Sequence, residues 1–216
     1  MTLTFKYLYN EITGQAWSMF DGDIENKDDF ETTVTTSIQK ALSDLWVSYE
    51  FEFRKLTKTI KTKPNVVEYN LPNGQIGTVD NKFNVKYDDK FLDYIWEPDK
   101  EQTGEPESFY LEKNKFCLYP TPDNNYIVKI GYLSMSPAKN KDDEEIPNLS
   151  EDDDYINIDE KYEDLFKNTL LPLAMMYLIA SESDENYSAY AWQYERAFKK
   201  LKKQTQSIKK ERVIGW

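Results

Sequence analysis

Apolar residues recur every three or four positions over two long stretches of the chain, a spacing typical of amphipathic helices. Residues 3–20 form the first such segment, and Asp21-Gly22-Asp23 is typical of a break. A longer segment starts near Asp28 and Asp29, acids that suit a helix N-terminus, and Pro64 sets its latest end. Its apolar stripe consists of Phe30, Val34, Ile38, Leu42, Leu45, Tyr49, Phe53, Leu56 and Ile60. One long helix is therefore predicted here.

Helical periodicity returns in the last quarter of the chain. Apolar residues follow it from Tyr162 to Ala180 and again from Tyr187 to Leu201, with SESDEN between the two segments. Pro172 should kink the first of these helices or mark a late first turn. The two helices are predicted to form a helical hairpin.

Between the helical stretches, apolar and polar residues alternate with the period of β-strands. The segment VVEYNLP runs into Asn73-Gly74, a strong signal for a hairpin turn. A second hairpin is predicted with its turn near residues 112–114. In FCLYPTPDNNYIVKIGY, residues 116–132, Pro120 and Pro122 lie between two strand patterns, so they are expected in the connection of a third hairpin.

Only the helices carry apolar stripes long enough to bury one another. We therefore predict an α+β fold, a helical bundle with a central antiparallel β-rich insertion and an extended C-terminal tail. The predicted parts are the N-terminal helices (1–64), the insertion (65–135), an acidic loop (136–160), the helical hairpin (161–206) and a docking tail (207–216).

Composition limits the chemistry that the chain can perform. It has no histidine and a single cysteine, Cys117, which excludes Ser-His-Asp and Cys-His nucleophile pairs, Cys/His zinc sites within one chain and an intrachain disulfide. Cys117 lies within a strand pattern and is predicted to be a small core residue. The sequence also lacks the phosphate-binding and nucleophile-elbow motifs. We therefore expect no enzymatic activity, no cofactor and no metal.

The formal net charge is −12, from 27 basic and 39 acidic residues, which makes the chain a poor candidate for wrapping DNA. Residues 142–164 are strongly acidic and residues 196–212 are basic. This asymmetry indicates a partner surface, or subunits that pair head to tail. The acidic run could bind Ca²⁺ or Mg²⁺, although it lacks the glycine and terminal glutamate of an EF-hand, so a solvated loop is favoured. A metal-dependent hydrolase and a monomeric acidic binding module remain the alternative functions.

The N-terminal residues show no basic region followed by a continuous apolar stretch, and so they do not resemble a signal peptide. The longest apolar run, residues 170–180, is too short to span a bilayer. A soluble intracellular protein without a membrane partner is expected.

Several segments occur in an order that is similar to one family. These are DLWVSYEFEFRK, EYNLPNGQIGTV, a WEP and GEP loop, FCLYPTPDNNYIVKIGY, IPNL and YEDLFKNTLLPLAMMYL. Together they resemble the head–tail connector proteins, also called adaptor or ring proteins, of short-tailed bacteriophages, including tail tubular protein A and the ring proteins of crAss-like phages. The resemblance covers nearly the whole chain and rests on aromatic, proline and turn residues. The long acidic loop at 139–160 departs from the smallest adaptors.

The resemblance implies a structural virion protein, made in the host cytoplasm and placed at the head–tail junction. Subunits would form a homo-oligomeric ring, commonly of twelve copies, beneath the portal protein, and DNA would pass through the lumen without sequence-specific binding. The insertion would meet the next tail or ring protein through Tyr119, Pro120, Pro122 and Asp123. The C-terminal segment would clasp the portal through Ile208, Lys209, Lys210, Arg212, Val213, Ile214 and Trp216, with Trp216 as the apolar anchor.

Overall fold

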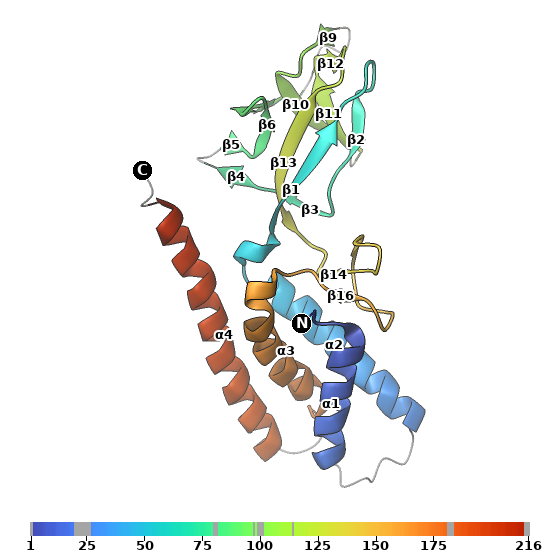
Figure 1. Ribbon diagram of the computed structural model, residues 1–216, viewed down its shortest axis with the longest axis vertical. Helices are drawn as coiled ribbons and strands as arrows, with labels where there is room; N and C mark the ends of the chain where they lie inside the picture. Colours follow the sequence, from blue (N-terminus) through green and yellow to red (C-terminus); the bar gives the residue numbers. More distant parts are fainter. Residues whose placement is uncertain are drawn as a thin grey trace. The chain divides into compact units, whose positions relative to one another are not determined.

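A computed structural model describes residues 2–19, 27–79, 82–96, 98, 102–113, 115–180 and 184–213, with side chains of 184–185 and 206–213 outside the description. The chain divides into two compact units (Figure 1). The helical unit comprises Met1–Phe53 together with Ser136–Trp216, and the β unit comprises Arg54–Met135. With helices in one unit and mostly antiparallel sheets in the other, the α+β fold class is confirmed.

The helical unit is built mainly from four α-helices. These are α1 (Phe5–Met19), α2 (Lys27–Val47), α3 (Glu163–Leu178) and α4 (Asp184–Val213). There are also two short 3-10 helices. The first, η1 (Glu52–Arg54), follows α2 in the chain, and the second, η2 (Glu160–Tyr162), directly precedes α3. Pro172 lies inside α3 well past its first turn, so α3 continues through it.

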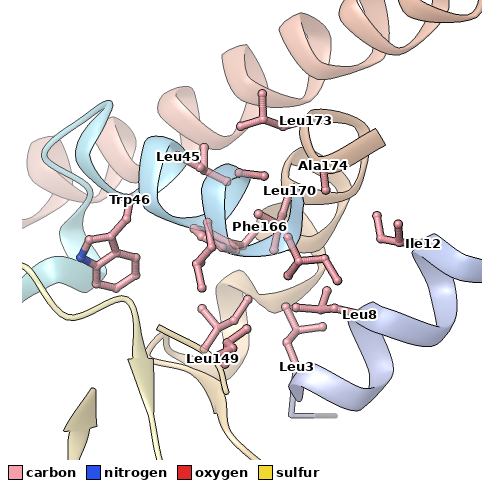
Figure 2. Close-up of a cluster of buried hydrophobic side chains, with 14 of the residues drawn as sticks. Leu3, Leu8, Ile12, Leu45, Trp46, Leu149, Phe166, Leu170, Leu173 and Ala174 are labelled. Carbon is pink, nitrogen blue, oxygen red and sulfur yellow. The ribbon is translucent and has the colours of Figure 1, made fainter. Parts of the chain in front are cut away.

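The core of the helical unit lies where α1, α2 and α3 meet. Figure 2 shows Leu8 and Ile12 of α1 on one side of this core and Phe166 and Leu170 of α3 near its centre. Trp46 of α2 also packs in this core, with its ring centroid 6.3 Å from that of Phe166. These side chains are almost completely buried, so the predicted apolar stripes do pack against one another.

The predicted helix over residues 28–60 is wrong in its second half. α2 ends at Val47, and Lys55–Lys61 form strand β1. Phe51 and Phe53 of the connection stack on each other within the helical core, with centroids 5.0 Å apart and planes at 13°. The spacing of the apolar residues beyond Val47 fits both the period of a strand and that of a helix. Pairing with strand β13 stabilises the strand in the segment Lys55–Lys61.

In the described part of the β unit, two sheets have four or more strands. The first has the order β1 (Lys55–Lys61), β13 (Ile127–Ser134), β6 (Val85–Tyr87) and β7 (Lys90–Phe91), and β3 (Gly74–Ile76) also pairs with β13. The second has the order β2 (Glu68–Asn70), β11 (Lys115–Tyr119), β10 (Ser108–Glu112) and β8 (Asp93–Tyr94). Two-residue strands form two further pairs, β4 (Thr78–Val79) with β5 (Lys82–Phe83) and β9 (Thr103–Gly104) with β12 (Thr121–Pro122).

One apolar cluster joins the two sheets. Val128 and Ile130 of the first sheet are fully buried, as are Phe109 and Phe116 of the second, and all four belong to the same cluster. Side chains from two inner faces that share one core define a sandwich. The insertion is therefore a small two-layer β-sandwich.

Two of the three predicted hairpins are wrong. β10 and β11 pair as predicted, from Ser108 opposite Tyr119 to Glu112 opposite Lys115. However, the strands on either side of residues 120–126, β11 and β13, lie in different sheets, and so do β2 and β3 on either side of Asn73. The turn residues mark where a strand ends in each case, but they do not determine whether the next strand pairs with the last one or belongs to the other sheet.

The segment predicted as a solvated acidic loop forms a small sheet of the helical unit. Its strands have the order β15 (Glu145–Ile146), β14 (Ala138–Lys139) and β16 (Tyr155–Ile156). Leu149 and Ile156 are buried in the helical core, while acids such as Asp142 and Asp153 are exposed. Buried apolar residues between the acidic ones therefore attach this segment to the core, although its acidic composition predicts a solvated loop.

Candidate docking surfaces

The connection from β11 to β13, residues 120–126, is fixed to the sandwich by Thr62. The Thr62 hydroxyl donates to the Asn124 carbonyl oxygen at 2.9 Å. The Thr62 N–H donates to the Tyr126 carbonyl oxygen at 2.9 Å, and the Tyr126 N–H donates to Thr62 Oγ1 at 2.6 Å. Thr62 is completely buried, and its side chain is one of the groups that hold this connection in place.

The residues predicted to meet a tail component occupy unequal positions on this connection. Asp123 is exposed and Tyr119 and Pro120 are half-buried, whereas Pro122 is buried. Pro122 belongs to β12, and its carbonyl oxygen accepts the N–H of Asn65 at 2.8 Å. Pro122 therefore positions the connection, and the other three residues remain available to a partner.

A hollow of about 430 Å³ lies beside this connection. The rings of Tyr87 and Tyr126, both on its wall, meet edge to face with centroids 5.3 Å apart. Their hydroxyls donate to carboxylates, Tyr87 to Glu105 Oε1 at 2.6 Å and Tyr126 to Asp123 Oδ1 at 2.5 Å. These hydrogen bonds, with a smaller contribution from burial, raise the pKa of each tyrosine to about 12. Both phenols therefore stay neutral and fixed at neutral pH.

Ile127 is another residue of this hollow, and its side chain is 55% exposed. Neither Ile127 nor Tyr87 is among the docking residues predicted from the sequence. A signal for Ile127 was present, because it alternates with Val128 and Ile130 and must lie on the opposite face of the strand from the core. Tyr87 has no comparable signal, since its approach to Tyr126 depends on the pairing of β6 with β13.

The acidic segment holds one buried carboxylate, Asp154. Its Oδ2 accepts the N–H of Ser150 at 2.8 Å, the N–H of Glu151 at 2.8 Å and the Ser150 hydroxyl at 3.0 Å. Burial acts to raise the pKa of this carboxyl, but the hydrogen bonds outweigh it and lower the pKa below its ordinary value. Over the described ranges, no three His, Cys, Asp or Glu side chains are grouped as a metal site would require.

Cys117 is buried in β11, as predicted. Burial raises the pKa of its thiol, so the thiolate needed for nucleophilic chemistry is disfavoured. Among the helices in the described part of the chain, none is both long enough and apolar enough to cross a membrane.

The residues predicted to dock on the portal lie at the end of the chain. The backbone from residue 207 to Val213 is helical and belongs to α4, so this part of the predicted extended tail continues the preceding helix. The side chains of Ile208, Lys209, Lys210, Arg212 and Val213 lie outside the described part, and so do Ile214 and Trp216 entirely.

A comparison with curated proteins finds no match for the chain. A profile of the SU10 adaptor protein family matches residues 10–212, which includes both the helical unit and the β unit. The narrower resemblance to tail tubular protein A and to crAss-like phage ring proteins stays a prediction. Because the match covers most of the chain, the protein belongs to the SU10 adaptor protein family and is a phage structural adaptor protein.

Proposed function

We propose that this adaptor forms the ring that joins the portal to the tail, and that DNA leaves the head through its lumen. Membership of an adaptor family supports a connecting role in the virion. Such a role requires separate surfaces for the portal, for the next tail component and for neighbouring subunits.

The length of α4 is the observation that carries the portal contact. α3 has 16 residues and α4 has 30, which at 1.5 Å per residue makes α4 longer by about 20 Å. Thr205 of α4 is buried, and the helical backbone continues for eight residues beyond it to Val213. We therefore assign the portal contact to this C-terminal part of α4.

The sequence of residues 208–216 suits a docking segment. Lys209, Lys210 and Arg212 carry positive charge, and Val213, Ile214 and Trp216 are apolar. Such a segment fits a groove that is apolar with an acidic rim, where a buried tryptophan dominates the binding energy and the basic residues speed association.

The β unit supplies the surface for the next tail component. The connection fixed by Thr62 and the hollow beside it combine rigid aromatic rings with the exposed Ile127. Rigid groups lose little entropy on binding, so they suit a permanent structural contact. The net charge of −12 per copy suits a channel through which DNA moves without being bound, because like charges repel.

Truncation after Ser207 tests the portal contact. Heads that carry portals are incubated with the full chain or the truncated chain, and the adaptor that sediments with the heads is measured. We expect the full chain to attach and the truncated chain to lose most of its attachment, while both melt at similar temperatures. Attachment of the truncated chain at the level of the full chain would exclude a docking role for residues 208–216.

A further inference from the structure

α4 carries two stripes of side chains on opposite faces. The packed stripe faces the bundle and consists of Tyr190, Tyr194, Phe198, Leu201 and Thr205. Within it, Phe198 meets Phe51 edge to face at 6.2 Å. The outer stripe has the same helical spacing, is exposed throughout, and consists of Trp192, Arg196, Lys199 and Lys203.

The outer stripe is basic and contains an exposed tryptophan, and one of its lysines, Lys199, also forms an exposed pair with Glu195 at 3.9 Å. Trp192 is 62% exposed, and the guanidinium of Arg196 lies 5.5 Å from the centre of its ring. Tryptophan and arginine are the residues most enriched at the energetic centres of protein interfaces. The stripe therefore has the composition of a contact surface.

A groove of complementary charge lies between α1 and α2 of the same unit. It has a volume of about 490 Å³, and its walls include Asp28, Glu31 and Asp152. Glu31 also pairs with Lys27 at 3.6 Å and Asp152 with Lys6 at 3.0 Å, and because both pairs are exposed and weak, these carboxylates can exchange partners on docking. Phe5 and Tyr9 supply aromatic surface, and threonines of α2 leave the groove without large side chains along one wall. Burial and then the charge of Glu31 raise the pKa of Tyr9, consistent with a negative potential in the groove.

The stripe and the groove lie on different sides of the helical unit. Figure 1 shows α3 between α4 and α1. A chain cannot bring its own outer stripe into its own groove in this arrangement. Two different complementary patches on one subunit form a heterologous contact, and repetition of such a contact generates a closed ring when the rotation between subunits closes.

We propose that the outer stripe of α4 docks into the α1–α2 groove of a second copy of this chain. This inference rests on the proposed ring and names the surfaces that join its subunits. Arg196, Lys199 and Lys203 of one copy face the carboxylates of the next, and Trp192 packs against Phe5 and Tyr9. The α1–α2 groove has the size of a small-ligand pocket, so it receives a few side chains from the stripe and not the whole helix.

Two charge-reversed chains test this contact. The stripe variant carries Arg196→Glu, Lys199→Glu and Lys203→Glu. The groove variant carries Asp28→Lys, Glu31→Lys and Asp152→Lys. Between two copies of the stripe variant, an acidic stripe meets an acidic groove. Between two copies of the groove variant, a basic stripe meets a basic groove. We therefore expect each variant alone to assemble on portal-bearing heads roughly tenfold less than the unmodified chain, or worse.

An equal mixture of the two variants should restore assembly. The acidic stripe of one variant then meets the basic groove of the other, and the remaining pairs are those of the unmodified chain, so a ring with an even number of copies can close. Misfolded chains could not rescue each other in this way. The matched control carries Lys61→Glu, Lys82→Glu and Lys90→Glu, which reverse three exposed lysines of the β unit, and it should assemble normally.

The outcomes separate this inference from the ring function itself. If the unmodified chain assembles and both variants assemble equally well, the contact lies elsewhere. If only the stripe variant fails and the mixture does not recover, the stripe binds another partner, such as DNA, and the inference is wrong. If the unmodified chain never attaches to portals, the proposed function is wrong.

A cross-linking experiment tests the contact without the portal. A chain with Trp192→Cys and Thr36→Cys, oxidised at high protein concentration, should give a ladder of covalent multimers on a denaturing gel. Either substitution alone gives no species beyond a dimer, and the native Cys117 is buried. A double-cysteine chain that stays monomeric would overturn the proposed contact.

Discussion

Thr62 and Tyr126 exchange hydrogen bonds in both directions, the N–H of each donating to an oxygen of the other at 2.9 and 2.6 Å. They are separated by 64 positions along the chain, and they connect the end of β1 to the start of β13. The Thr62 hydroxyl also donates to the Asn124 carbonyl oxygen, so one buried side chain holds the predicted docking connection at two points.

Thr62→Val should therefore destabilise the protein by about 1–3 kcal/mol. Valine has the shape of threonine, but it leaves the Tyr126 N–H and the Asn124 carbonyl oxygen without this partner. Thr62→Ser keeps the hydroxyl and is the matched control, with a smaller loss expected. Chemical denaturation of both variants measures the difference, and equal stabilities would show that the hydroxyl does not hold the connection.

Phe53→Ala should cost about 3–5 kcal/mol, the usual range for removing a buried phenylalanine. Phe53 is 4% exposed, and its ring contacts those of Trp46, Phe51, Tyr162 and Phe166. Val47→Ala at the exposed end of α2 should change the free energy of unfolding by no more than about 0.5 kcal/mol. A small effect at Phe53 would contradict its place in the core.

The burial of Phe53 was predictable from the sequence, although its secondary structure was not. The apolar stripe identifies which residues face a core, and Phe30 to Leu45 follow it as a helix. Beyond Val47, the choice between a helix and a strand depends on β13, whose sequence lies more than sixty residues away. The local spacing of apolar residues contains no information on pairing with a distant strand. The sequence therefore predicts which residues are buried better than it predicts whether they lie in a helix or a strand.

The docking connection shows the same limit. Pro120, Pro122 and Asp123 are typical turn residues, and they predict where the strand β11 ends. The two sheets of the sandwich could not be predicted, because the sequence of a strand does not determine which other strand it pairs with. Tyr87 and Ile127 consequently joined the candidate surface only once the pairing of β6 with β13 was known.

Asp154→Ala should destabilise the protein by about 1–3 kcal/mol at neutral pH, because two backbone N–H groups and the Ser150 hydroxyl lose their acceptor. The lowered pKa means that folding favours the ionised carboxylate. Its contribution is therefore fully present above the unfolded-state pKa, about 3.9, and is lost as pH falls through the lower folded-state pKa.

Denaturation of Asp154→Ala and of the unmodified chain at several pH values checks this dependence. The difference between them should shrink as the pH falls below about 4. Asp153→Ala, at an exposed neighbouring position, is the control and should show little difference at any pH. A difference that grew on acidification would show that the neutral acid, not the carboxylate, is the stabilising form.

Gly131→Ala should destabilise the β unit by about 1–3 kcal/mol, since a methyl group at this position would overlap the side chain of Asn84. The Gly131 N–H donates to the Asn84 carbonyl oxygen at 2.7 Å, so the two backbones cannot easily separate. In an Asn84→Ala background the same glycine substitution should cost less. A double-mutant cycle measures this coupling, and strict additivity would exclude the overlap as the cause.

Ile127→Asp should weaken attachment of the next tail component while the adaptor still binds portal-bearing heads. Ile127 is 55% exposed beside the hollow, so the substitution does not disturb the core, but a charge there would lose its water on docking. Lys129→Asp, also beside the hollow, is the control for a change of charge alone. The measurement is the fraction of adaptor-bearing heads that acquire the tail component. If Ile127→Asp particles acquire it normally and only Lys129→Asp particles do not, charge and not apolar contact determines docking at this surface.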